Sequence, residues 1–103
     1  VRENTQGLLE NSYNLSISNA SDKTQIVTAE VSGLEDIHIT GMPPQGIVVP
    51  AGQLVSAPVQ VNVPPEYAEK GSHPIMFTFR YRYEEQPETE VREIKEKSIF
   101  IGE

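Results

Sequence analysis

The chain has 103 residues, a length typical of one domain, and no stretch approaches the roughly 20 consecutive apolar residues of a membrane span. Its 15 acidic and 8 basic residues give a formal net charge of -7 at pH 7, which would repel phosphate backbones and argues against a nucleic-acid partner. Cysteine is absent, so disulfides, thiolate metal sites and cysteine nucleophiles are excluded. We therefore expect residues 1–103 to form a single acidic domain that does not itself insert into a membrane.

The first predicted elements are two strands joined by a turn. Residues 13–19 alternate apolar and polar side chains, as expected of a strand with one buried face. Residues 19–23 have the composition of a turn, and the alternation resumes over residues 25–32 until Gly33. This arrangement favours a β-hairpin between the two strands.

Three further strands are predicted in the middle of the chain. Residues 37–40 and 47–49 are short candidates, and residues 41–46 between them hold two prolines and two glycines, which favour an irregular loop. Residues 55–63 place their valines on one parity, as in a half-buried strand. Because proline lacks the N–H that a ladder needs, Pro58 is expected at a sheet edge or in a bulge.

The clearest strand covers residues 73–83, after a possible helical turn over residues 65–70 and before a loop over residues 84–89. Its apolar and aromatic side chains share one parity: Ile75, Phe77, Phe79, Tyr81 and Tyr83. Arg80 and Arg82 lie on the other parity, so one face of this strand is predicted to be buried and the other exposed to solvent. Such a face requires a second layer of structure opposite it.

The last predicted strand runs from about residue 91 to residue 101, and its apolar residues are divided between its two faces. Ile94 and Phe100 share one parity, whereas Val91, Ile99 and Ile101 share the other. A bulge or a change of sheet near residues 95–98 would let the buried face switch partway. With about seven strands and no long amphipathic helix, the sequence predicts an all-β, immunoglobulin-like or fibronectin-like β-sandwich.

A copper site built from soft ligands would have to draw on the only imidazoles and thioethers of the chain, namely His38, Met42, His73 and Met76. His38 and Met42 flank one loop and form the most favourable pair. Each of the four also has an ordinary structural or solvent-exposed interpretation. We therefore assign no catalytic, cofactor-binding or metal-binding residue to this chain and keep copper binding as an alternative hypothesis.

Arg80 and Arg82 form a small basic stripe opposite the aromatic face of their strand. The simplest interpretation is cross-strand pairing with carboxylates such as Glu93 or Glu96. The alternative is a docking surface for an acidic partner.

Several segments of the chain resemble, in the same order, the C-terminal domain of the FixG/CcoG cytochrome c oxidase accessory proteins. These segments are residues 1–3, Gly7, the Asn-x-Tyr-x-Leu-x-Ile-x-Asn run within residues 10–19, residues 31–34, residues 50–52 and the valine strand that ends at Pro64. The likeness spans nearly the whole chain.

The resemblance implies an integral membrane protein whose upstream portion holds transmembrane helices and a ferredoxin-type segment with 4Fe-4S clusters. The family is associated with maturation of a high-affinity heme-copper oxidase through copper reduction. The present chain would be an immunoglobulin-like module on the periplasmic side of the bacterial inner membrane, with residues 1–7 as its linker. Its partners would be proteins of oxidase assembly or copper delivery, and the resemblance carries no catalytic residue or cofactor to any position here.

The favoured hypothesis is therefore a non-catalytic interaction module of a membrane-bound iron-sulfur protein. Two alternatives remain open: a domain that binds copper directly, and an accessory domain of a secreted glycosidase that stacks exposed aromatic rings on sugars.

Overall fold

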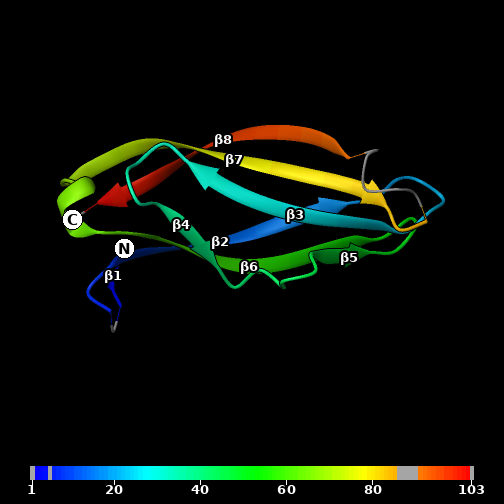
Figure 1. Cartoon of the computed structure of the whole chain (residues 1–103), viewed down its shortest axis with the longest axis horizontal. Coiled ribbons are helices and arrows are strands. Elements are labelled where there is room, and N and C mark those ends of the chain that lie inside the picture. Colours follow the sequence, from blue (N-terminus) through cyan, green and yellow to red (C-terminus); the bar gives the residue numbers. More distant parts are fainter. Residues whose placement is uncertain (1, 5, 86–90, 103) are drawn as a thin grey trace.

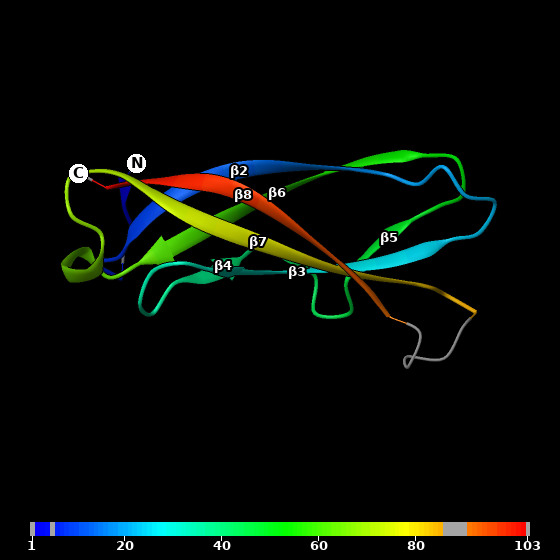
Figure 2. The same ribbon diagram turned by 90° about the horizontal axis from the view of Figure 1, so that it is seen from above.

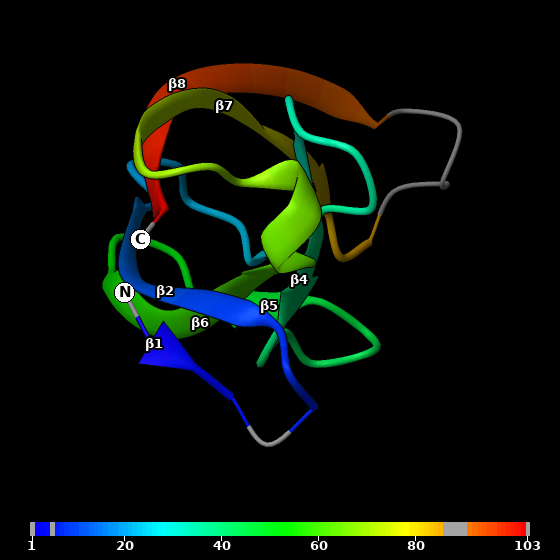
Figure 3. The same ribbon diagram turned by 90° about the vertical axis from the view of Figure 1, so that its left-hand side faces the viewer.

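The computed structural model describes residues 2–4, 6–85 and 91–102, which form two facing β-sheets in an elongated body of 44 × 22 × 21 Å (Figure 1). The strands are β1 (Arg2–Glu3), β2 (Leu9–Ser18), β3 (Gln25–Ser32), β4 (His38–Thr40), β5 (Ile47–Val49), β6 (Leu54–Val63), β7 (Gly71–Tyr83) and β8 (Arg92–Gly102). One sheet has the order β1-β2-β6-β4 and the other β5-β3-β7-β8, with antiparallel neighbours throughout. Figure 3, seen along the long axis, shows the two layers. The predicted all-β sandwich is confirmed.

The expected hairpin between residues 13–19 and 25–32 is wrong. β2 pairs with β6 along its whole length, whereas β3 pairs with β5 and β7 in the other sheet. The connection between β2 and β3 therefore crosses from one layer to the other. Alternation along a strand shows that one face is buried, but it does not say which strand is the partner.

Asn19 holds this crossing in place, and its side chain is 1% exposed. Its Nδ2 donates hydrogen bonds to the carbonyl oxygens of Lys23 at 2.8 Å and of Val49 at 2.9 Å. Its Oδ1 accepts one from the N–H of Ser21 at 3.0 Å. The amide thus joins the connection to the end of β5, and its burial is compensated by these bonds.

The predicted bulge or change of sheet at residues 95–98 is also wrong. The register between β7 and β8 runs without interruption from Tyr81 opposite Arg92 to Gly71 opposite Gly102. Phe100 faces inward and is fully buried, while Ile99 and Ile101 lie on the outer face, 54% and 44% exposed. No switch of face is needed, because exposed apolar side chains are common on protein surfaces.

The core fills the space between the sheets in two clusters. The larger contains Leu9, Val61, Val63, Ala68, Ile75, Phe77 and Phe100, and the smaller contains Val27, Ile47 and Val49. Phe79 packs against both clusters and joins them. Fully burying a side chain such as Phe100 stabilises the fold by about 1.5 to 3 kcal/mol.

The shorter elements agree largely with expectation. A single 3-10 turn, η1 (Pro65–Tyr67), replaces the predicted helical turn, and residues 41–46 form an irregular loop. Pro58 lies in β6 beyond the last residue that β4 pairs, so its missing N–H opposes no strand on that side. The predicted loop at residues 84–89 lies outside the described residues from residue 86 onward.

The segment expected as a linker, residues 1–7, contributes to the fold through β1, which pairs Arg2 and Glu3 with Glu10 and Leu9. The assignment of residues 1–103 to one domain stays a prediction.

Candidate functional site

On one side of the sandwich, β2 of the first sheet lies next to β8 of the second sheet. β1 pairs only with Leu9 and Glu10, so the described strands leave β2 from Asn11 to Ser18 without a neighbour on the side opposite β6. β8 is the last strand of the other sheet. Two strand edges therefore flank the same side of the sandwich, and this side divides into two halves.

In the closed half, side chains of β2 take the place of a neighbouring strand for β8. The Nδ2 of Asn11 donates to the carbonyl oxygen of Ile101 at 3.0 Å, and the N–H of Ile101 donates to Oδ1 of Asn11 at 2.8 Å. The hydroxyl of Tyr13 donates to the carbonyl oxygen of Ile99 at 2.7 Å. Since an amide side chain offers the same donor and acceptor as a peptide group, Asn11 satisfies the edge of β8 in the manner of a strand.

The ring of Tyr13 also packs against the larger core cluster. It meets the ring of Phe77 edge-on, with centroids 5.3 Å apart and an interplanar angle of 75°. Burial raises the pKa of the Tyr13 hydroxyl above its ordinary value of 10.0, because the ionised form loses hydration there. The phenol thus remains the proton donor of its hydrogen bond at neutral pH.

In the open half, a groove of about 580 Å³ is bordered by residues 14–18 of β2 and by Ile94, Glu96, Lys97 and Ser98 of β8. Figure 2 shows the two strands together near the C-terminus and diverging toward the other end. The bottom of the groove is formed by Val27, Phe77, Phe79 and Tyr81. Strand twist separates the edges with distance from the closed half, so the second sheet does not cover β8 here.

Ile94 shows the consequence of this separation. It has the same inward parity as Phe100 and pairs with Phe79, yet 47% of it is exposed. Leu15 and Ile17 on the opposite wall are half-buried. Glu96 and Lys97 are the charged residues among those lining the groove, and Asn14, Ser16 and Gln25 add polar groups, so the groove combines an apolar floor with polar rims.

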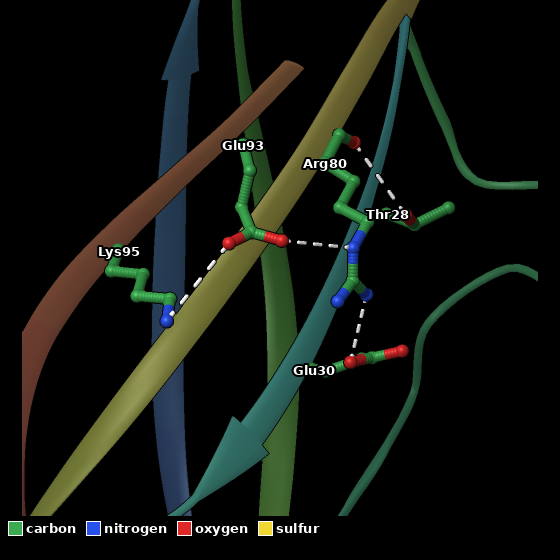
Figure 4. Close-up of polar contacts among 5 residues, drawn as sticks. All are labelled: Thr28, Glu30, Arg80, Glu93 and Lys95. Carbon is green, nitrogen blue, oxygen red and sulfur yellow. Dashed lines mark hydrogen bonds and ion pairs between the residues drawn. The ribbon is translucent and has the colours of Figure 1, made fainter. Parts of the chain in front are cut away.

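The predicted basic stripe lies on the outer face of the β3–β7 sheet. Nη1 of Arg80 lies 2.8 Å from Oε2 of Glu30, and its Nε lies 3.2 Å from Oε2 of Glu93 (Figure 4). The predicted pairing with Glu93 is confirmed. Glu30 of β3 is a second partner, which the sequence did not predict. Lys95 extends the group, with Nζ 3.9 Å from Oε1 of Glu93.

The hydrogen bond that Arg80 donates to Glu30, followed by the negative charge of Glu30, raises the pKa of the Arg80 guanidinium. The alternative partner Glu96 stands opposite Phe77 and therefore has inward parity, away from Arg80. Arg82 pairs with Ile26 on the outer face. Arg80 is thus held between two strands, and docking of an acidic partner on this face stays a prediction.

The four copper candidates are spread over different parts of the fold. His38 is exposed on β4, and Met42 in the following loop packs against the smaller core cluster. His73 and Met76 lie on β7 in the other sheet with opposite parity, and Nε2 of His73 is 2.6 Å from the carbonyl oxygen of Glu69. In the described ranges, no three His, Cys, Asp or Glu side chains gather in a group that could hold a metal ion.

The sequence reading did not assign roles to Asn11, Tyr13 or Ile94. One signal was available for the first of these, because Asn11 stands on the same parity as Tyr13, Leu15 and Ile17 in a strand pattern. A polar amide on the buried face of a strand needs hydrogen-bond partners inside the protein. Its partner, 90 residues away on β8, is visible only in the fold.

Comparisons with known proteins agree with this architecture. A family model described as the IG-like fold at the C-terminal of FixG matches residues 1–103. The crystal structure of a FixG-related protein from Vibrio parahaemolyticus is similar, with a TM-score of 0.73 and 24% sequence identity. That match covers 94% of this chain and 82% of the other chain, and it shows a shared fold. The search of curated proteins gives no match.

Among the described residues, no helix has the length and apolar character required to cross a membrane. The family match extends over both sheets and over both halves of the β2–β8 edge. The chain therefore belongs to the family of immunoglobulin-like domains found at the C-terminus of FixG.

Proposed function

We propose that this chain is a non-catalytic interaction module of a membrane-bound, FixG/CcoG-like iron-sulfur protein. In this proposal the whole protein takes part in copper reduction and in the assembly of a high-affinity heme-copper cytochrome c oxidase. The module lies on the periplasmic side of the bacterial inner membrane and binds a protein of oxidase assembly or copper delivery. Membership of the FixG C-terminal family supports the assignment to such a protein.

The observation that carries the interaction role is the open half of the β2–β8 edge. A groove of about 580 Å³ with an apolar floor, bordered by two strand edges, offers both hydrophobic surface and backbone hydrogen-bonding groups to another chain. Folded proteins usually cover or blunt such edges, since they are templates for pairing with another strand. An edge left open beside apolar surface favours protein recognition.

The shape of the domain supports this role. Figure 1 shows the N- and C-termini at one end of the long axis, whereas the start of β8 and the end of β2, which border the groove, lie toward the other end. A tether joined to the N-terminus would therefore leave the open half directed away from the membrane anchor. The groove would then be accessible to a partner.

Deletion of residues 8–103 from the intact protein tests the proposed function. We expect less assembled oxidase in membranes, measured as heme-copper oxidase activity per unit of oxidase subunit, with the membrane portion still present and its iron-sulfur content unchanged. Replacement of the domain by an unrelated β-sandwich of similar size is the matched control and should not restore assembly. Normal assembly in the deletion strain would contradict the proposal.

The basic stripe is tested separately by reversing Arg80 and Arg82 to Glu in the intact protein. If the outer face of the β3–β7 sheet is the docking surface, capture of the assembly partner should fall at least tenfold. Unchanged capture would exclude this face and leave the groove as the contact surface.

A further inference from the structure

We propose that the open half of the β2–β8 edge binds an extended strand of another protein, in which acidic and apolar residues alternate. The strand pairs with the free edge of β8 and places its apolar side chains in the groove. This inference rests on the proposed function and specifies the chemistry of the partner and its mode of binding. It is derived from three features of the groove: backbone direction, side-chain parity and charge.

The backbone of β8 offers an unpaired ladder in the open half. The N–H and C=O of Ile101 and the C=O of Ile99 point toward β2, where Asn11 and Tyr13 bind them. Because backbone direction alternates in an antiparallel strand, Lys97 and Lys95 present their groups on the same side. Among the described residues, no hydrogen bond reaches these groups of Lys95 and Lys97.

The parity of the side chains sets the pattern of the incoming strand. On β8, Ile94 and Glu96 point toward the groove, whereas Lys95 and Lys97 point to the outer face beside Thr78 and Met76 of β7. An added strand must alternate in the same way. Its inward side chains would meet the apolar walls of the groove, and its outward ones would lie beside the two lysines.

Charge complementarity then selects acidic residues for the outward positions. Opposite charges on neighbouring strands stabilise pairing and like charges weaken it. At physiological ionic strength charges interact over about 8 Å, so the two lysines act locally. Nζ of Lys95 already lies 3.9 Å from Oε1 of Glu93, and Lys97 therefore contributes the larger share of the attraction. The five residues from 94 to 98 correspond to roughly 17 Å of strand, which sets the length of the bound segment at about five to seven residues.

A second copy of this chain complements the site poorly. The outward positions of its own β8 edge are Glu93, Lys95 and Lys97, two of which repeat the charge of the site, and its β2 edge is uncharged from Asn11 to Ser18. The acidic, alternating strand is therefore assigned to a different protein.

The test uses the ¹⁵N-labelled 103-residue chain and a synthetic probe, acetyl-Glu-Val-Glu-Ile-Glu-Val-Glu-amide. Titration followed by NMR should give saturable shifts of the amide signals of Lys95 and Lys97, and hydrogen exchange at these amides should slow at least tenfold. A peptide of the same composition with its acidic and apolar residues in separate blocks should bind at least tenfold more weakly. A peptide with Lys in place of each Glu should also bind at least tenfold more weakly.

Two variants form a matched pair. Lys97→Glu should weaken the acidic probe at least fivefold and strengthen the lysine probe. Lys70→Glu makes the same change of charge near the start of β7, away from the groove, and should leave both affinities within twofold. Both residues are exposed, so neither substitution disturbs the core.

The proposal is overturned if the three peptides bind equally, if the shifts fall outside β2 and β8, or if no peptide binds at 1 mM. A concentration-dependent dimer that covers the same amides would instead identify a second copy as the occupant and would also overturn it. Failure here, combined with defective oxidase assembly on deletion of residues 8–103, would leave the interaction role intact and refute only this binding mode.

Discussion

The two halves of the β2–β8 edge are built from the same pair of strands, yet one is sealed and the other is open. In the closed half, Asn11 and Tyr13 bind the backbone of Ile99 and Ile101 directly. In the open half, the corresponding inward positions of β2 are Leu15 and Ile17, which have no polar group to offer. A sandwich edge can thus be closed by side chains alone, without an additional strand.

The two halves also differ in whether their residues contribute mainly to stability or mainly to binding. Residues of the closed half are buried or hydrogen-bonded, and loss of their contacts should weaken the fold. The strand-edge residues of the open half, 14–18 of β2 and 94–98 of β8, are half-buried or exposed and form no such bonds, so substitutions at these positions should affect binding more than folding.

The largest effect is expected for Gly102→Ala at the end of the closed half. A Cβ added at this buried residue would overlap the carbonyl oxygen of Glu69 and lie 2.7 Å from that of Ala68. Because backbone atoms cannot yield as side chains do, we expect a loss of about 3 kcal/mol or more in the free energy of unfolding, measured with urea. Gly52→Asn is the control, since nothing lies within 4 Å of an added Cβ there and Asn tolerates the positive φ of 70° at this position. Equal effects of the two substitutions would contradict the packing seen around Gly102.

Asn11→Leu should be the next most damaging. The substitution removes both hydrogen bonds to Ile101 and leaves its N–H and C=O without their partner, which costs about 2 to 3 kcal/mol. Urea unfolding measures the loss, and hydrogen exchange at the Ile101 amide should accelerate in step. Asn14→Leu, on the exposed face of the same strand, should change stability by less than about 0.5 kcal/mol. A stable Asn11→Leu protein would show that the amide does not close the edge.

Tyr13→Phe should have a smaller effect, because it keeps the ring contact with Phe77 and removes only the bond to Ile99. We expect a loss of about 1 kcal/mol at neutral pH. Burial raises the pKa of Tyr13 in the folded state, so above the ordinary value of 10.0 the unfolded chain binds fewer protons. Stability of the parent protein should therefore fall as pH rises above about 10, and the variant should lack this part of the fall. Identical pH profiles between pH 9 and 11 would refute the burial of the hydroxyl.

Ile94→Thr, in the open half, should have the smallest effect on folding. With 47% of the side chain exposed, its replacement should change the free energy of unfolding by less than about 0.5 kcal/mol. The same substitution should reduce binding of the alternating acidic probe severalfold, because it removes apolar surface from the groove wall. A large loss of stability without any change in binding would reverse the roles assigned to the two halves.

Prediction from the sequence succeeded where the signal was local. The parity of the aromatic residues in β7 identified its buried face, and the pairing of Arg80 with Glu93 followed from neighbouring strands of one sheet. It failed where the answer depended on partners distant in the chain. The β2–β3 hairpin was wrong because β2 instead pairs with the distant strand β6, from Ser18 opposite Leu54 to Leu9 opposite Val63. The bulge in β8 was wrong because Ile99 and Ile101 tolerate exposure.

Because period-two alternation is a property of each strand alone, the amino-acid sequence was sufficient to predict strands with one apolar face and two layers that cover one another. It also carried the likeness to the FixG C-terminal family. The tertiary structure alone decided which strands are neighbours and where the two sheets separate. It placed Asn11 against Ile101 and left the groove open beside Ile94, since pairing and twist arise from contacts between segments that alternation does not encode.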